Sequence, residues 1–285
     1  MVRGLLPDQD KVSALVRSTH VEQGTQSPAI YVGSAGWSIP QACAPYFPDG
    51  GSHLERYAQV FNAVEINSSF YRTHLPKTYE RWAGSVPEGF RFSVKFPRGI
   101  THEARLEDCH AALETFLAGV GRLGHKLGCL LLQLPPSLVW NPRVALTFIA
   151  DVRRMHQGPI VCEPRHVSWL HHGVSHALAA HQVSRAAADP ALCLRALVPA
   201  GHHQLEYLRL HGTPRMYHGS YAEASLGYLA SRLQQAAGDT AERWCVFDNT
   251  ADGYAIPNGL SLMAQLGSAP GFHLFSAEPA GSCNP

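Results

Sequence analysis

Short apolar runs recur along the chain, and stretches in which apolar residues follow helical spacing separate them. The runs have four to seven residues. Their starts lie roughly 20–40 residues apart, so each interval has room for a crossover helix. This alternation predicts strands connected by helices. The runs that we predict as strands are Ile30–Ala35, Ala63–Asn67, Phe90–Phe96, Gly128–Leu134, Ile160–Glu163, Val183–Ala188, Leu205–His211 and Trp244–Asp248.

Local helix signals support the alternation. Ser52 and Glu55 have capping-box spacing immediately before an apolar-periodic run. Asn141 followed by Pro142 places a good N-cap residue before a proline at the first helical position. Apolar residues in Ala222–Ala237 follow helical spacing and predict a further helix.

Eight strands that alternate with helices predict a single TIM-type (β/α)8 barrel of the α/β class, with eight parallel strands and outer helices. We expect this domain to cover residues 29–267, with a loosely ordered N-terminal extension at residues 1–28 and a C-terminal tail at residues 268–285. The alternative is an open doubly wound sheet. Gly33 and Gly36 after the first strand lack the G-x-G-x-x-G spacing, which disfavours a dinucleotide-binding version of that sheet.

Alternation within the predicted strands places polar groups on one face near the strand ends. In the third run, Phe92 and Val94 oppose Ser93 and Lys95. In a barrel the outward set meets the helices, and the inward set near the carboxyl ends lines the active-site mouth. Burial of unpaired polar groups is unfavourable, so we predict a functional pocket there. The polar residues at these ends are Glu65, Asn67, Lys95, Gln133, Glu163, Asp189, Arg209, His211, Asp248 and Asn249.

The alternative to a pocket is a set of buried ion pairs, such as Glu65 with Lys95 or Glu163 with Arg209. Such pairs would account for individual residues. They explain a whole ring of polar groups less well, because a barrel does not need them for stability.

The charge balance limits the classes of partner. The chain has 285 residues, and 23 Lys and Arg against 22 Asp and Glu give a formal net charge of +1. No overall field would therefore attract nucleic acid or an anionic membrane. No apolar run is long enough to span a bilayer and no signal peptide is evident, so we expect a cytoplasmic protein without a membrane partner. The 7 cysteines include no C-x-x-C pair and are typical of reduced, buried thiols.

The carboxylates are the first candidates for chemistry. Glu65 and Glu163 lie on separate predicted strands, where two carboxylates can share a proton, hold a divalent ion or flank a scissile bond. Asp189, His211 and Asp248 are tentative additional ligands of such a metal shell. The alternative for His211 is a hydrogen bond to a neighbouring carboxylate.

Basic, aromatic and amide side chains complete the predicted site. Lys95, Arg165 and Arg209 form a candidate anion cradle, because guanidinium groups suit phosphate or carboxylate. Their alternative role is charge compensation for the nearby acids. His102 and His166 follow strand ends, where loops carry catalytic residues. The other predicted substrate contacts are Trp37, Phe70, Tyr71, Trp169, Asn67, Gln133 and Asn249.

Several motifs together resemble the YecE-like family, also called domain of unknown function 72. The match covers about residues 30–265 in family order. Its segments are Gly33–Ser38, Phe61–Tyr71, Phe92–Lys95, Ile100–His102, Gln133–Pro136, Glu163–Trp169, Tyr207–Gly212 and Asn249–Gly253. The resemblance implies a TIM-type barrel and supplies no activity. Asp248 stands where the family usually has asparagine, which adds an acid near the mouth.

The leading hypothesis is an enzyme that binds a small anionic substrate at the carboxyl ends of the strands. Glu65 and Glu163 would act as acid and base or as metal ligands, while His102 or His211 would move a proton. Hydrolysis of a phosphoester or glycosidic bond, with or without a divalent metal, is the expected class. The alternatives are a nucleic-acid-binding or nuclease-like protein and a non-catalytic metabolite-binding protein. The sequence identifies no other cofactor and no oligomeric state.

Overall fold

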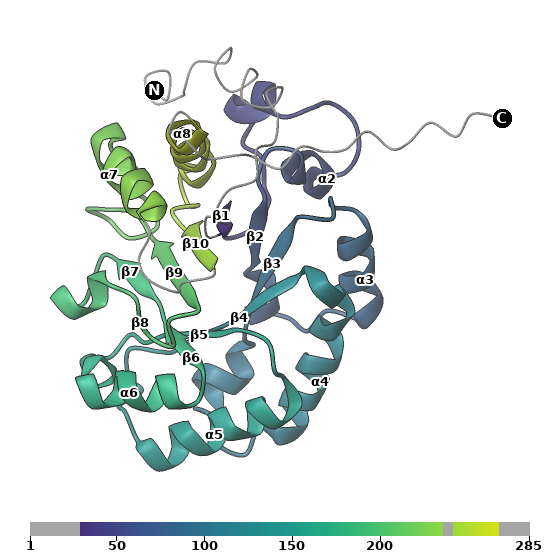
Figure 1. Ribbon diagram of the computed structural model, residues 1–285. Helices are drawn as coiled ribbons and strands as arrows, with labels where there is room; N and C mark the ends of the chain where they lie inside the picture. The colour runs from purple at the N-terminus through teal and green to yellow at the C-terminus, as the bar shows by residue number, and fades with distance from the viewer. Residues whose placement is uncertain (1–28, 236–241, 268–285) are drawn as a thin grey trace, which may run out of the picture.

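Strands arranged in two sheets surround an apolar interior, and helices cover the outside (Figure 1). The computed structural model describes residues 29–235 and 242–267. The strands are β1 (Ala29–Ser34), β2 (Ala63–Ile66), β3 (Arg91–Lys95), β4 (Leu127–Gln133), β5 (Ile160–Glu163), β6 (Val183–Arg185), β7 (Ala187–Asp189), β8 (Ala200–Gly201), β9 (Leu205–Leu210) and β10 (Glu242–Phe247). The predicted extensions at residues 1–28 and 268–285 lie outside the described residues.

The α-helices follow the strands around the outside. They are α2 (His53–Ala58), α3 (Pro76–Gly84), α4 (His110–Val120), α5 (Pro142–Met155), α6 (His172–Ala180), α7 (Glu223–Gln234) and α8 (Ala255–Gly267). Shorter helices are η1 (Gln41–Tyr46), η2 (Ser68–Phe70), the π-helix η3 (Gly99–Glu103), η4 (Gly121–Lys126), η5 (Val167–Leu170) and η6 (Leu194–Leu197). No helix within the described ranges is long and apolar enough to cross a membrane.

The local signals in the sequence predicted these elements well. Each predicted strand position holds a strand, although the sixth run is divided into β6 and β7. The Ser52 and Glu55 side chains form the expected reciprocal capping box on α2. The Asn141 side chain accepts hydrogen bonds at the start of α5, with Pro142 at the first helical position. Helix α7 occupies the predicted region, whose last two residues lie outside the described ranges.

The prediction of a single eight-stranded parallel barrel is wrong. The strands form a parallel four-stranded sheet in the order β1-β10-β9-β7 and a mixed six-stranded sheet in the order β2-β3-β4-β5-β6-β8. Strand β8 pairs antiparallel with β6, and no strand was predicted there. The two sheets meet at two places where a continuous ladder is interrupted.

The first interruption separates β1 from β2, where side chains replace the backbone ladder. The Asn62 side chain accepts from Val32 N and donates to Ile30 O. Farther along, the Tyr57 hydroxyl accepts from Ser34 N at 2.9 Å and donates to Ala63 O at 3.1 Å. These side chains form hydrogen bonds with backbone groups that a neighbouring strand would otherwise pair. The backbone pairing between β1 and β2 is therefore reduced to the isolated bridge between Ala35 and Glu65.

The second interruption divides the sixth strand at Ala186. Strand β6 pairs with β5 and, on its other edge, with the antiparallel β8. Because β8 occupies that edge, β9 pairs instead with β7, beyond the break. The sixth strand therefore contributes one short segment to each sheet.

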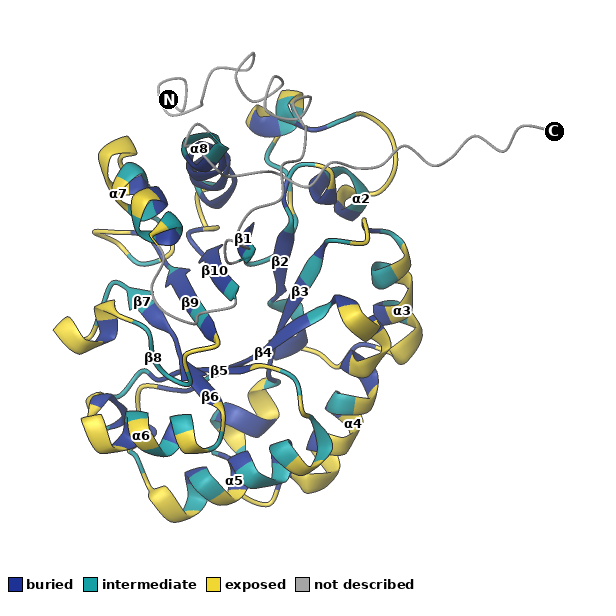
Figure 2. Cartoon of the chain, in the orientation of Figure 1, coloured by how far each residue is buried: buried dark blue, intermediate teal, exposed yellow. Residues whose placement is uncertain are grey.

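The interior and the outer core have different compositions. Side chains of both sheets form an interior cluster that includes Tyr31, Tyr207 and Trp244. The Trp244 ring lies 4.8 Å from the Tyr31 ring and 5.9 Å from the Tyr207 ring, measured between centroids. A larger cluster fills the space between the strands and the helices. In Figure 2 the strands are buried, and the helices expose their outward faces. Both clusters bury apolar area, which is the main stabilising contribution to folding.

The side-chain connection between β1 and β2 leads to a stability prediction. We expect Tyr57→Phe to lower the free energy of unfolding by about 1–3 kcal/mol, because it leaves buried backbone groups of Ser34 and Ala63 without a partner. Urea denaturation followed by circular dichroism measures the change. Tyr228→Phe is the matched control, because Tyr228 is 73% exposed. Equal stability of the two variants would contradict the proposed role of the Tyr57 hydroxyl.

Candidate functional site

Interior positions change from apolar to polar toward the carboxyl ends of the strands. On β9 the interior side chains are Leu205, Tyr207 and Arg209 in sequence. On β2, β5 and beyond the end of β10, the same alternation brings Glu65, Glu163 and Asp248 to this polar layer. The alternation read from the sequence is thus confirmed for Glu65 and Arg209. It had not assigned a face to Glu163 or Asp248.

Arg209 is the centre of this layer, and its guanidinium joins three carboxylates from three strands. Its Nε and Nη2 lie 2.9 and 2.7 Å from the two oxygens of Glu65. Its Nη1 lies 3.0 Å from Glu163 Oε2, and Nη2 also lies 2.9 Å from Asp248 Oδ2. The Tyr207 hydroxyl donates to Glu65 Oε2 at 3.1 Å. All five side chains are buried, so every one of these charges depends on its partners.

His211 and Arg165 extend the network. The two ring nitrogens of His211 face one carboxylate each, with Nε2 at 3.0 Å from Glu163 Oε1 and Nδ1 at 3.0 Å from Asp248 Oδ2. Arg165 Nη2 lies 2.5 Å from Glu163 Oε1 and also contacts the His211 ring. We call the side chains of Glu65, Glu163, Arg165, Arg209, His211 and Asp248 the Arg209 cluster.

The cluster favours ionised carboxylates. Burial by itself would raise the pKa of Glu163, but Arg209, Arg165 and His211 outweigh it and hold the pKa well below its usual range. Burial also opposes ionisation of Asp248, yet Arg209 and His211 lower its pKa. Burial disfavours the charged form of Arg209, and the three carboxylates raise its pKa well above the usual value. Glu163, Asp248 and Arg209 therefore stabilise one another as ions.

Lys95 lies at the end of β3 and differs from the other charged groups of the layer. Its side chain is buried, and its Nζ lies 4.1 Å from the centre of the Phe70 ring. No hydrogen bond or ion pair joins its ammonium group to another described residue. Burial, together with the charge of Arg209, lowers the pKa of Lys95 to about 8, although the three carboxylates oppose this change.

His102 lies beside Lys95 on the π-helix η3. Its ring packs edge-on against Phe70 at 4.9 Å, and its Nδ1 lies 2.8 Å from the Thr101 hydroxyl. Burial lowers the pKa of His102, and the positive charges of Lys95 and Arg98 lower it further. One Phe70 ring therefore contacts both Lys95 and His102, and a π-helix is a frequent feature of functional sites.

The loop after β9 covers the Arg209 cluster. The Tyr217 ring packs edge-on against His211 at 5.6 Å, and Met216 Sδ lies 3.9 Å from Arg165 Nη1. Tyr217 has a φ of 69°, which is unfavourable for a side chain of this size. No periodic pattern in the sequence marks Tyr217 or Met216, because both lie in a loop. Tyr207 lies two residues before Arg209 on β9 and so points to the same face. Side-chain alternation along this strand could therefore have identified Tyr207 as a neighbour of the Arg209 cluster.

Other predicted site residues have mainly structural contacts. Asp189 accepts a hydrogen bond from the Tyr221 hydroxyl at 2.7 Å. His166 contacts Ser168 at the start of η5. Gln133 donates to Leu134 O, and the amide nitrogen of Asn249 donates to Gly219 O and Asn258 Oδ1. Asn67 Oδ1 and Asn249 Oδ1 are buried and have no hydrogen-bond partner among the described residues.

The predicted aromatic walls lie apart from one another. The Trp37 ring packs edge-on against Trp82 at 5.1 Å. Tyr71 is 74% exposed, whereas Trp169 is buried and donates from Nε1 to Leu138 O. Trp169 lines a cavity with Trp140, and no residue of the Arg209 cluster lines that cavity.

The tentative metal ligands are not assembled as a metal shell. Glu65, Glu163, His211 and Asp248 come together around Arg209, while Asp189 pairs with Tyr221. The cation at their centre is thus a guanidinium. Within residues 29–235 and 242–267, no group of three or more His, Cys, Asp and Glu side chains is arranged to hold a metal ion.

Comparison with known proteins gives a family match over most of the chain. The sequence profile described as "Protein of unknown function DUF72" matches residues 31–281. The chain is 37% identical to the UPF0759 protein YecE of Escherichia coli over 114 residues, which is 40% of this chain and 40% of that protein. It is 29% identical to the UPF0759 protein YunF of Bacillus subtilis over 147 residues, or 50% of this chain and 52% of that protein. The matches therefore span about half the length of these relatives or less.

Solved structures show a related fold. A DUF72 family protein from Enterococcus faecalis aligns with a TM-score of 0.71 and 20% identity, over 84% of this chain and 96% of that one. A DUF72 family protein from Thermotoga maritima aligns with a TM-score of 0.68 and 21% identity, over 84% and 99% of the two chains. At this level of identity the likeness concerns the fold alone.

The charge network leads to a prediction about acid stability. We expect Glu163→Gln to lower the free energy of unfolding by about 3–5 kcal/mol at pH 7, because Arg209, Arg165 and His211 lose a buried counter-charge. The folded-state pKa of Glu163 lies below the ordinary value of 4.5. Its stabilisation is therefore fully present above pH 4.5 and is lost as the pH falls through the folded-state pKa.

The difference in the free energy of unfolding between wild type and Glu163→Gln should consequently become smaller below pH 4.5. Denaturant titrations between pH 7 and about pH 3 test this expectation. Glu114→Gln provides the control, because the Glu114 side chain is 63% exposed and pairs only with His110 among the described residues. If the difference in the free energy of unfolding between wild type and Glu163→Gln stayed constant across this pH range, the ionised form of Glu163 would not be the cause of that difference.

Proposed function

Because the chain belongs to the DUF72 family, which is described only as one of unknown function, we propose a function from the site itself. It is an enzyme that acts on a small anionic substrate at the carboxyl ends of the strands. Lys95 holds the anion and exchanges a proton with it, while the Arg209 cluster positions the surrounding groups. The observation that carries this proposal is the state of Lys95, a residue only 6% exposed whose ammonium group has no hydrogen-bond or ion-pair partner among the described residues.

An unpaired buried ammonium group is unfavourable unless something compensates it. Here the Phe70 ring contributes a cation–π contact at 4.1 Å. All three hydrogen-bond donors of the ammonium group remain available for a ligand. An anion at this place would supply both the missing acceptors and the missing charge. Lysine at a pKa of about 8 also changes its protonation state readily near neutral pH, which suits a proton carrier.

The contacts of the two glutamates argue against the acid and base roles predicted for them. Both oxygens of Glu65 pair with Arg209, and both oxygens of Glu163 pair with cationic groups. A guanidinium fills the space between the two carboxylates, where a glycosidase would bind the scissile bond. We therefore assign positioning roles to Glu65 and Glu163, and assign proton transfer to Lys95 with His102.

This arrangement favours phosphoester chemistry over glycosidic hydrolysis. A phosphoryl group presents several acceptor oxygens to Lys95 and to Arg165, whose Nε is buried without a described partner. His211 contacts Arg165 and two carboxylates, so it orients Arg165 rather than reaching the substrate itself. A divalent metal, a nucleic-acid partner and a purely binding role stay predictions.

A substitution series at Lys95 tests the proposal with phenyl phosphate as the probe. We expect the wild type to bind phenyl phosphate more weakly as the pH rises through about 8, because Lys95 loses its proton there. Lys95→Gln should weaken binding about tenfold or more at pH 7 and abolish any phosphate release. Isothermal titration calorimetry measures the binding, and a phosphate assay measures the release.

Two further variants test whether the change in binding comes from the charge and the titration of Lys95. Lys95→Arg should keep binding but lose the pH dependence near 8, because arginine stays protonated. Lys77→Gln is the control for loss of an exposed lysine and should resemble the wild type. Unchanged binding in Lys95→Gln would overturn the assignment. Tight, Lys95-dependent binding without any phosphate release would support the non-catalytic alternative.

A further inference from the structure

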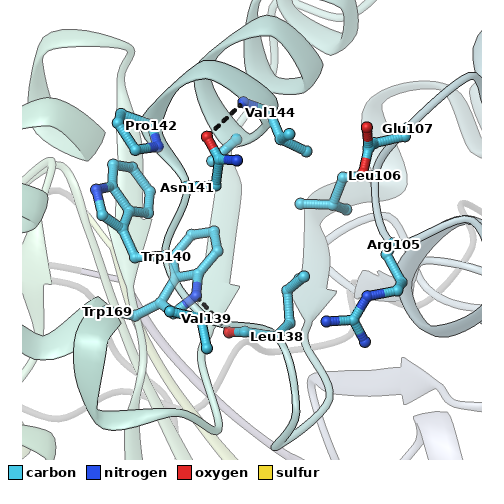
Figure 3. Close-up of a pocket in the computed structure, with 11 residues that line it drawn as sticks. Arg105, Leu106, Glu107, Leu138, Val139, Trp140, Asn141, Pro142, Val144 and Trp169 are labelled. Carbon is cyan, nitrogen blue, oxygen red and sulfur yellow. Dashed lines mark hydrogen bonds between the residues drawn. The ribbon is translucent and has the colours of Figure 1, made fainter.

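A separate cavity of about 420 Å³ lies between segments that follow β3, β4 and β5 (Figure 3). One wall comes from residues 138–145, which connect β4 to α5 and include the first turns of α5. The other wall comes from Arg105, Leu106 and Glu107, in the segment after η3. None of the residues that line the cavity belongs to the Arg209 cluster. Its volume falls in the range of small-molecule sites, roughly 300–1,000 Å³.

The aromatic side of the cavity is held rigidly. The Trp140 and Trp169 rings pack edge to face at 4.6 Å. Trp169 Nε1 donates to Leu138 O at 2.9 Å, and Trp140 N donates to Ser168 Oγ at 2.7 Å. Trp140 is only partly buried, and its ring lies beside Pro142, with the Trp169 ring toward the Leu106 side (Figure 3). A rigid aromatic and aliphatic wall favours a flat, apolar body.

The opposite side holds a cation in an unusual backbone conformation. Arg105 and Leu106 have φ angles of 53° and 73°, in the left-handed region that such residues rarely adopt. The turn is supported by a hydrogen bond from Leu106 N to Ile100 O at 3.0 Å. It directs Arg105 toward the cavity, where Nη1 and Nη2 donate to Ser137 at 3.0 and 2.9 Å (Figure 3). Residues in such strained conformations cluster at functional sites.

The Arg105 guanidinium has no carboxylate partner among the described residues. Its Ser137 contacts are with neutral oxygens, so its charge is uncompensated on the protein side. Glu107 also lines the cavity but forms no ion pair with Arg105. A single negative charge would complement Arg105, whereas a second one would be repelled by Glu107.

We propose that this cavity is a binding site for a small apolar or aromatic monocarboxylate. The carboxylate pairs with Arg105, and the apolar body rests against Trp140, Leu138 and Leu106. This site does not depend on the function proposed for Lys95, because neither Lys95 nor any residue of the Arg209 cluster lines this cavity. Its ligand differs from a phosphoryl substrate in charge and in the large apolar fraction of its surface.

The experiment compares 2-naphthoate with the neutral 2-naphthamide by isothermal titration calorimetry on the full chain. We expect saturable binding of 2-naphthoate to one site. Arg105→Gln should weaken 2-naphthoate about tenfold and leave 2-naphthamide nearly unchanged, because only the former loses a charge-assisted hydrogen bond. Trp140→Leu should weaken both compounds, since both lose the aromatic wall.

Two variants at exposed positions keep the result independent of folding defects. Val139 is 55% exposed, and Val139→Asp at the edge of the cavity should weaken 2-naphthoate but not 2-naphthamide. Arg122→Gln is the matched arginine control, because its side chain is 59% exposed and pairs with Glu80 away from the cavity. Absence of saturable binding, or binding that none of Arg105→Gln, Trp140→Leu and Val139→Asp weakens, would overturn the proposal.

Discussion

Burial of the Arg209 guanidinium is the constraint on which the rest of the site depends. A guanidinium keeps its charge in a protein, so its burial requires counter-charges within hydrogen-bond distance. Glu65, Glu163 and Asp248 supply them from the ends of β2, β5 and β10. Arg209 belongs to the four-stranded sheet, and both glutamates belong to the six-stranded sheet. These ion pairs therefore cross between sheets that share no continuous ladder.

This constraint sets the paired carboxylates apart from Lys95 and His102. Both oxygens of Glu163 accept from cations, which hold its pKa well below the usual range and keep it ionised near neutral pH. The network consequently fixes the geometry of the layer, including the two sides of the His211 ring, while Lys95 and His102 remain at its margin. Lys95 is not joined to this network by an ion pair, although the three carboxylates act on its pKa in the direction opposite to burial and Arg209.

Alternation along the strands predicted which residues enter the polar layer, because side-chain direction follows directly from strand geometry. Of the two ion pairs that the sequence suggests, the structure contains the one between Glu163 and Arg209, at 3.0 Å, but not the one between Glu65 and Lys95. Glu65 contacts Arg209 rather than Lys95, since a guanidinium reaches both carboxylate oxygens at once. It also missed the division into two sheets, which depends on Tyr57 and Asn62, side chains from outside the strands. Such tertiary contacts leave no periodic signal in the sequence. The loop that contains Tyr217 leaves none either, so its position over the Arg209 cluster could not be predicted.

The segment after β5 links the Arg209 cluster to the cavity that Trp140 and Trp169 line. Glu163 and Arg165 belong to the cluster, and Trp169, only four residues beyond Arg165, forms part of the cavity wall. Between them, His166 contacts the Ser168 hydroxyl, which accepts from Trp140 N. The backbone course needed to bring Arg165 to Glu163 therefore also determines where Trp169 packs. This shared segment explains why one sequence motif contains residues of the cluster and of the cavity wall, and why Trp169 lies in that cavity rather than beside the carboxylates.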